Sequence, residues 1–122
     1  MAAMPASVLI VDDDVAFRKL ATRIVGSWGH VVVGEAGTVA EAVALAAELK
    51  PDAALVDVGL PDGDGLMLAE RLRGAVSRLR VVLISSDADA ASSAAVHHVG
   101  AVGFVPKDEL PSDRLRRLIA GE

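Results

Sequence analysis

Short apolar runs alternate with helix-patterned segments along the chain, and this alternation restricts the fold more than any other feature. The apolar runs cover residues 7–11, 31–33, 53–56, 81–84 and 102–105. Strands that alternate with helices pair in parallel through right-handed crossovers, because each helix has to cover one apolar face of the sheet. The sequence therefore predicts an α/β fold of five βα units, which is too short for an eight-stranded barrel.

Capping residues mark the ends of the expected helices. The third helix is expected to stop at Gly74, and the fourth is an alanine-rich segment over residues 87–98, whose small side chains bury little apolar area. The last helix is expected over residues 111–120. The other signals are Asp14 and Gly29 around the first helix, and Thr38, Glu41 and Pro51 around the second.

Composition and charge exclude several classes of protein. The 122 residues, of which 52% are hydrophobic, suit a single domain over residues 1–122, and we expect about the first six to be disordered. The absence of cysteine excludes disulfides and thiolate metal sites, and no apolar run approaches the roughly 20 residues that span a bilayer. A net charge of −5 argues against direct nucleic-acid binding. A cytoplasmic protein without a membrane segment is expected.

Four of the apolar runs end on polar residues that together suggest one site. Asp12 and Asp13 follow the first run, Asp57 the third, Ser85 the fourth and Lys107 the fifth. The carboxyl ends of parallel strands lie at one edge of the sheet, where open α/β folds bind their ligands. The sequence therefore predicts an acidic pocket that contains one hydroxyl and one lysine.

These side chains favour phosphoryl chemistry with a divalent cation. Adjacent carboxylates repel one another and raise their own pKa values unless a cation compensates them. Mg²⁺ prefers such oxygens and commonly takes further ligands from a phosphate. One aspartate would then attack a phosphoryl group, Lys107 and the metal would neutralise its oxygens, and Ser85 would donate a hydrogen bond. The expected product is an acyl phosphate.

The segments VLIVDDD, LVDVGLPDGDG, VVLISS and GFVPK resemble, in order, the four signature segments of response-regulator receiver domains. The pattern D-x-x-L-P-x-x-x-G that begins at Asp57 is the most specific of them, and the resemblance covers almost the whole chain. It implies a CheY-like, flavodoxin-like doubly wound sheet of five parallel strands in the order 2-1-3-4-5. It also implies a two-component signalling domain that is not an enzyme beyond its own phosphorylation and dephosphorylation.

The resemblance also assigns a role to each site residue. Asp57 would accept the phosphoryl group, and Asp12, Asp13, Asp57 and the backbone carbonyl of Gly59 would bind Mg²⁺. Ser85 would be the switch hydroxyl, Phe104 the rotating switch aromatic, and Lys107 the phosphate-binding lysine. Pro106 would follow a cis peptide bond. Gly59 and Asp87 would tune the rate of dephosphorylation.

The implied partners are a sensor histidine kinase or phosphotransfer protein and an effector that the sequence does not name. Phosphorylation would remodel the surface of the fourth helix, fifth strand and fifth helix. The chain is expected to be a monomer that can dimerise when phosphorylated.

Several residues allow other interpretations. The metal-binding pair could be Asp13 and Asp14, although a helix cap is the simpler role for Asp14. Ser86 could replace Ser85 as the switch hydroxyl, although the register of the family favours Ser85. Asp62 and Asp64 lie in a glycine-rich loop that could suggest calcium binding. The EF-hand spacing and its terminal Glu are missing, however, and turn formation and helix capping explain these residues.

The sequence also allows two alternative functions. A haloacid-dehalogenase-like phosphatase would use Asp12 as its nucleophile in the pattern formed with Asp14, but Ala16 departs from that family and a cap domain is missing. A receiver-like binding module that takes no phosphate would keep the same fold, because one fold can host different functions.

Overall fold

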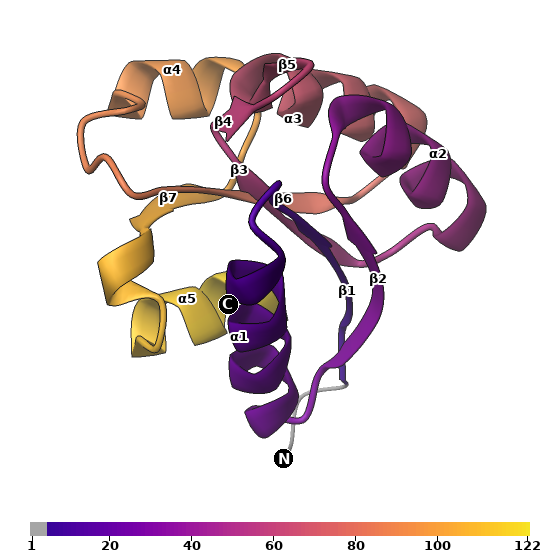
Figure 1. The fold of residues 1–122 in the computed structure, drawn as a ribbon, viewed down its shortest axis with the longest axis vertical. Coiled ribbons are helices and arrows are strands. Elements are labelled where there is room, and N and C mark those ends of the chain that lie inside the picture. The colour runs from indigo at the N-terminus through magenta and orange to yellow at the C-terminus, as the bar shows by residue number, and fades with distance from the viewer. Residues whose placement is uncertain (1–4) are drawn as a thin grey trace.

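The computed structural model describes residues 5–122 and contains a five-stranded parallel sheet between two layers of helices (Figure 1). The strands lie in the order β2-β1-β3-β6-β7, and a separate two-stranded hairpin supplies β4 and β5. The doubly wound fold and the order 2-1-3-4-5 of the main strands are therefore confirmed. The main strands are β1 (Ser7–Val11), β2 (Val31–Ala36), β3 (Ala53–Asp57), β6 (Arg80–Ser85) and β7 (Gly103–Pro106).

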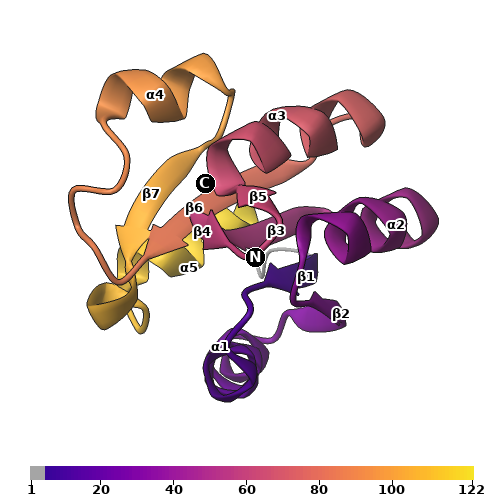
Figure 2. The ribbon, with the colours of Figure 1, turned by 45° about the horizontal axis from the view of Figure 1, so that its top comes forward.

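Helices cover both faces of the sheet, as Figures 1 and 2 show. Alternate residues of β1 point to opposite faces, so that Leu9 and Val11 pack in one core and Val8 and Ile10 in the other. Every residue of β3 is buried, as expected for a central strand covered on both sides. The first core lies under α2 (Val39–Leu49), α3 (Gly65–Ala75) and α4 (Ser93–His98), and the second under α1 (Val15–Ser27) and α5 (Asp113–Ala120).

The capping signals of the first two helices act as predicted. The carboxylate of Asp14 accepts hydrogen bonds from the backbone N–H groups of Ala16 and Phe17. The hydroxyl of Thr38 accepts one from the backbone N–H of Glu41. These side chains satisfy N–H groups that have no partner within the helix, which fixes where α1 and α2 begin.

Three helix boundaries were predicted wrongly. Helix α4 begins only at Ser93, because Asp87 accepts a hydrogen bond from the N–H of Asp89 in a local turn and Ser92 caps the helix that follows. Gly74 lies inside α3, which continues to Ala75. The last helix begins two residues later than expected, after its N-cap Ser112.

The loop LPDGDG forms a small antiparallel hairpin of β4 (Gly59–Leu60) and β5 (Gly63–Asp64), which the sequence did not predict. The Asp62 carboxylate at its turn accepts hydrogen bonds of 2.7 and 3.2 Å from the backbone N–H groups of Val39 and Ala40. These bonds lower the pKa of Asp62, the bond from Val39 contributing most. The hairpin is thereby fastened to the beginning of α2.

The peptide bond before Pro106 is trans, as are all the others between residues 5 and 122, so the prediction of a cis bond was wrong. Pro106 ends β7 in register with Ser85, and a short 3₁₀ turn, η1 (Lys107–Glu109), follows it. The trans isomer is the intrinsically favoured one, and it carries Lys107 to the sheet edge without a cis bond.

The N-terminal segment is tied to the sheet from Ala6 onward. The Ala6 N–H donates to Nδ1 of the buried His30, and the Ala6 carbonyl accepts from Val31 N–H. The expectation of disorder over the first six residues falls mainly on residues 1–4, which lie outside the described residues. Within residues 5–122, no helix has the length and apolar character needed to cross a bilayer.

Candidate functional site

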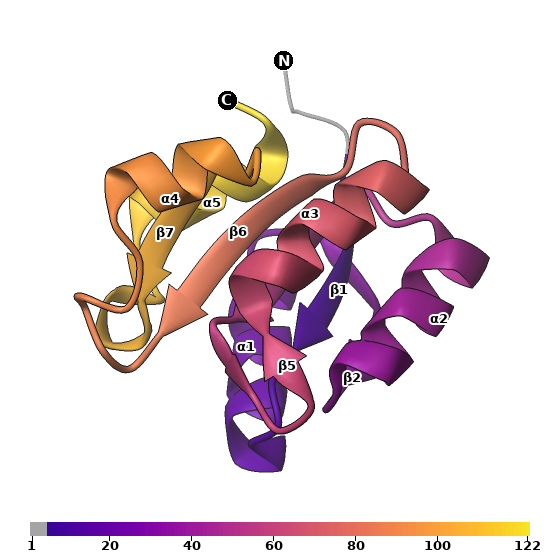
Figure 3. The same ribbon diagram turned by 90° about the horizontal axis from the view of Figure 1, so that it is seen from above.

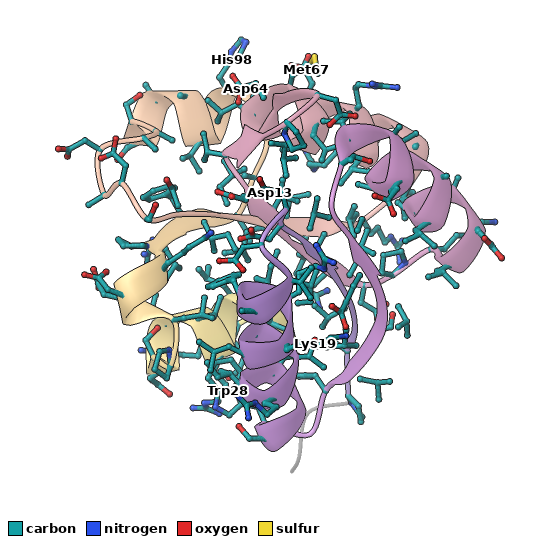
Figure 4. All side chains as sticks on the ribbon, in the orientation of Figure 1. Asp13, Lys19, Trp28, Asp64, Met67 and His98 are labelled. Carbon is teal, nitrogen blue, oxygen red and sulfur yellow. The ribbon has the colours of Figure 1, made fainter. Side chains whose placement is uncertain are left out.

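The predicted site residues meet at the carboxyl ends of the strands. Figure 3 shows β1, β6 and β7 pointing in the same direction, so that their carboxyl ends lie at one edge of the sheet, away from both termini. Figure 4 places Asp13 at this edge, at the beginning of α1, and Trp28 at the other end of that helix. Asp12, Asp57 and Ser85 are buried, whereas Asp13 is exposed. The sheet thus brings together residues separated by more than 90 positions in the sequence.

Three carboxylates form a group that suits a hard divalent cation. One oxygen each from Asp12, Asp13 and Asp57 lies within 4.8 Å of the others. Oδ2 of Asp12 is fully buried, and it faces the ammonium group of Lys107 at 2.6 Å. Three carboxylates that converge beside a single cationic side chain match the all-oxygen ligand set that Mg²⁺ prefers. The aspartate cluster therefore fits a metal ion.

Asp14 lies outside this cluster because its carboxylate caps α1. Its capping role favours Asp12 and Asp13 over the alternative pair of Asp13 and Asp14. Asp62 and Asp64 likewise accept hydrogen bonds from backbone N–H groups of α2 and α3, so turn formation and capping explain them.

Lys107 lies between the two buried acids. Its Nζ is 2.6 Å from Oδ2 of Asp12 and 3.5 Å from Oδ2 of Asp57. Burial alone would lower the pKa of the Lys107 ammonium, but hydrogen bonding and charge attraction from Asp12, supported by Asp57, outweigh burial and raise the pKa. The lysine is thus a fixed cation at the point where the acids converge.

The environment of Asp57 opposes its ionisation. Burial raises its pKa most, and the negative charge of Asp12 raises it further. The Lys107 charge and a 3.4 Å hydrogen bond from Gly59 N–H act in the opposite direction without cancelling the increase. A cation placed among these acids would favour the ionised carboxylate, which is the form that can act as a nucleophile.

The two predicted switch residues lie on neighbouring strands. Ser85 is buried, and its hydroxyl accepts a hydrogen bond from Asp87 N–H, whereas Ser86 is exposed, which favours Ser85 of the two serines. Phe104 is half-buried on β7 and lines a cavity of about 400 Å³ between α4 and β7. Its backbone carbonyl accepts a 2.7 Å hydrogen bond from Arg114 of α5.

Two positions were predicted to tune the dephosphorylation rate. Gly59 is exposed on the hairpin, and no described heavy atom lies within 4 Å of the place that a Cβ atom would occupy there. Asp87 is exposed, and its backbone N–H contacts the Ser85 hydroxyl. Gly59 therefore lies beside Asp57, to which its N–H donates a hydrogen bond, and Asp87 lies beside Ser85.

Two contacts at the site were not predicted from the sequence. The ring of Phe17 lies 4.3 Å from Nζ of Lys107, a cation–π arrangement. Arg18 donates a 2.5 Å hydrogen bond to the backbone carbonyl of Asp12. Phe17 and Arg18 both lie in α1, and no sequence motif distinguished them as site residues.

A family model described as the response regulator receiver domain matches residues 8–120. The chain belongs to the response-regulator receiver family. This receiver is a signalling domain, not a classical enzyme, and phosphorylation by a kinase is implied by its family.

Relatives and solved structures agree with this assignment. The receiver is 37% identical over 102 residues to the DNA-binding transcriptional activator DevR/DosR of Mycobacterium tuberculosis, with coverage of 83% of this chain and 47% of that protein. It is 30% identical to the nitrate/nitrite response regulator NarL of Escherichia coli K12, with coverage of 93% and 53%. The chain thus spans about half the length of the curated relatives it matches.

The fold is similarly close to solved receivers. The signal receiver domain of NarL from Mycobacterium tuberculosis aligns with a TM-score of 0.77 and 34% identity, covering 93% of this chain and 96% of that chain. A two-component response regulator of the LuxR family from Aurantimonas sp. SI85-9A1 aligns with a TM-score of 0.85 and 26% identity, covering 98% and 88%.

Proposed function

We propose that this receiver takes a phosphoryl group on Asp57 in a Mg²⁺-dependent reaction and uses it to change the surface formed by α4, β7 and α5. The observation that carries the proposal is the position of Asp57. It is buried, its carboxylate lies in one cluster with those of the metal-binding candidates Asp12 and Asp13, and its Oδ2 lies 3.5 Å from Nζ of Lys107. Nucleophile, cation site and fixed positive charge are the parts that phosphoryl transfer requires.

In the proposed reaction, an oxygen of the Asp57 carboxylate attacks phosphorus as the bond from phosphorus to the donor's leaving group breaks. The donor would be a phosphohistidine of a kinase or phosphotransfer protein, whose imidazole nitrogen keeps the electron pair of the broken bond. Asp12, Asp13, Asp57 and the Gly59 carbonyl would hold Mg²⁺, which supplies charge neutralisation for the phosphoryl oxygens when bound. Lys107 would move from Asp12 to a phosphoryl oxygen.

The phosphoryl group would then change the conformation of the domain. It adds charge and strong hydrogen-bond acceptors at the sheet edge, where the Ser85 hydroxyl can donate once it turns away from Asp87. Movement of Ser85 would leave space beneath β6, and Phe104 beside the cavity at α4 could turn inward. Helix α4 has only six residues and one buried side chain, which favours a mobile output surface.

Labelling with acetyl phosphate tests this function. Wild type, Asp57→Asn and Asp12→Asn are incubated with the labelled phosphodonor at a series of Mg²⁺ concentrations. We expect label on the wild type, no label on Asp57→Asn, and slower labelling of Asp12→Asn that recovers as Mg²⁺ increases.

The other outcomes would support the alternatives. Continuous hydrolysis of phosphate esters that survives Asp57→Asn but not Asp12→Asn would indicate a phosphatase. No label under any condition would indicate a binding module that takes no phosphate.

A further inference from the structure

The backbone that carries the two metal-binding candidates leaves the sheet immediately after β1 and is held from two sides. The Asp12 N–H donates a 2.9 Å hydrogen bond to the Ala36 carbonyl at the end of β2. The Asp12 carbonyl accepts its 2.5 Å hydrogen bond from Nη1 of Arg18, in the second turn of α1. Arg18 therefore supplies the side-chain contact that fixes the peptide between Asp12 and Asp13.

Arg18 is itself held in place by an ion pair. Its Nε lies 3.3 Å from Oε1 of Glu35 on β2, and Lys19 lies 3.1 Å from the other oxygen of that carboxylate. The side chains of Arg18 and Glu35 are only 17% and 23% exposed, so solvent screens this pair less than a fully exposed one.

The backbone beside Arg18 leaves room for the guanidinium. A Cβ atom at Gly37 would lie 3.2 Å from Nη1 of Arg18 and 3.9 Å from the Asp12 carbonyl oxygen. Glycine at this position, after β2, allows the Arg18 side chain to reach that oxygen. Residues from α1, β2 and the segment after β2 thus form one arrangement around the Asp12 peptide.

We infer that Arg18 is a positioning residue for the Mg²⁺ site: it fixes the Asp12–Asp13 peptide so that both carboxylates face the cation before it binds. This inference rests on the proposed function, because it assigns Mg²⁺ to the aspartate cluster. Without Arg18, binding has to order that peptide, which lowers affinity. Groups that orient metal ligands commonly change metal affinity by about 10- to 100-fold when they are removed.

Mg²⁺ titration followed by the backbone amide resonances of residues 12–14 tests the inference in the absence of any phosphodonor. We expect Arg18→Met to raise the Mg²⁺ dissociation constant about tenfold. Arg18→Lys, which keeps a donor but loses the planar fork, should have an intermediate affinity. Arg23→Met is the matched control, because Arg23 is exposed on the same helix, and it should bind Mg²⁺ like the wild type.

Gly37→Ala provides an independent route that leaves Arg18 in place. Gly37→Ala alone should weaken Mg²⁺ binding relative to the wild type. Added to Arg18→Met it should have little further effect, because the methyl group acts through the Arg18 guanidinium. If Arg18→Met folds poorly, Gly37→Ala alone tests the inference against the wild type, and an unchanged Mg²⁺ affinity in Gly37→Ala would then overturn it. Equal Mg²⁺ affinity in Arg18→Met and Arg23→Met, or fully additive effects of the Arg18 and Gly37 changes, would overturn the inference.

The titration and the labelling experiment can fail separately. A wild type that binds Mg²⁺ but takes no label would refute the proposed function, while the titration would still test Arg18. A wild type that is labelled while Arg18→Met binds Mg²⁺ normally would refute only the role of Arg18. At saturating Mg²⁺, labelling of Arg18→Met should return to the wild-type level, because no group that contacts the phosphoryl group has changed.

Discussion

Gly65, the last residue of the D-x-x-L-P-x-x-x-G pattern, allows α3 to begin directly against the backbone that carries Asp57. A Cβ atom at this position would lie 2.2 Å from the Asp57 carbonyl oxygen, 2.7 Å from Cα of Val58 and 2.9 Å from the Asp57 carbonyl carbon. All three are backbone atoms, so a change of side-chain rotamer cannot relieve the contact. We therefore predict that Gly65→Ala displaces either the start of α3 or the acceptor strand.

The expected loss of stability follows from this geometry. Adding a methyl group to a packed site commonly costs about 1–3 kcal/mol, and a clash with fixed backbone belongs at the upper end of that range. The higher helix propensity of alanine relative to glycine offsets only about 1 kcal/mol of this loss of stability. For a domain of this size, 1 kcal/mol corresponds to about 3–5 °C in Tm, so a net loss of about 2 kcal/mol lowers Tm by roughly 8 °C.

Thermal and urea unfolding followed by circular dichroism measure this effect. Gly74→Ala is the matched control in the same helix, because no described heavy atom lies within 4 Å of its Cβ position. It should be as stable as the wild type or more stable by about 0.5–1 kcal/mol. Equal stability of Gly65→Ala and Gly74→Ala would refute the packing argument.

Three further predictions concern charge. Lys107→Met removes the cation that pairs with Asp12 and Asp57, so the Mg²⁺ affinity measured by calorimetry should rise roughly fivefold or more. An unchanged affinity would show that Lys107 and the metal do not compete for these carboxylates. The raised pKa of Asp57 means that its ionisation destabilises the fold at neutral pH. Asp57→Asn should therefore raise Tm at pH 7. This gain in Tm should disappear as the pH falls below the unfolded-state pKa of about 3.9, because Asp57 is then protonated in both states. A gain in Tm that does not depend on pH would contradict ionisation of Asp57 as its cause. Asp62 has a lowered pKa, so the loss of Tm in Asp62→Ala should be full at pH 7 and shrink as acid protonates the wild-type carboxylate; a constant loss would exclude the charged cap.

The main site was predictable because it follows from one rule of parallel sheets. Once β1, β3, β6 and β7 are identified as strands, their carboxyl ends must share an edge, so the side chains that follow them must meet. Local capping by Asp14 and Thr38 was predictable for a similar reason, since each cap bonds to N–H groups two or three residues away.

The contacts that support the site could not be predicted in the same way. The partners of Arg18 lie six and seventeen residues away, and Asp62 caps a helix that begins 23 residues earlier in the chain. No local pattern specifies such pairs, because they depend on how neighbouring elements pack. The length of α4 was overestimated because alanine favours helix, whereas Asp87 and Ser92 form competing local hydrogen bonds.

The most direct test of the proposed phosphoacceptor is to locate the phosphoryl group. The wild-type receiver is labelled with acetyl phosphate and Mg²⁺, quenched rapidly and digested, and the modified residue is identified by tandem mass spectrometry. The structure predicts one phosphoryl group, on Asp57 and dependent on Mg²⁺. A phosphoryl group on Asp12 or on a histidine, or an unmodified Asp57 in protein shown to bind Mg²⁺, would contradict it.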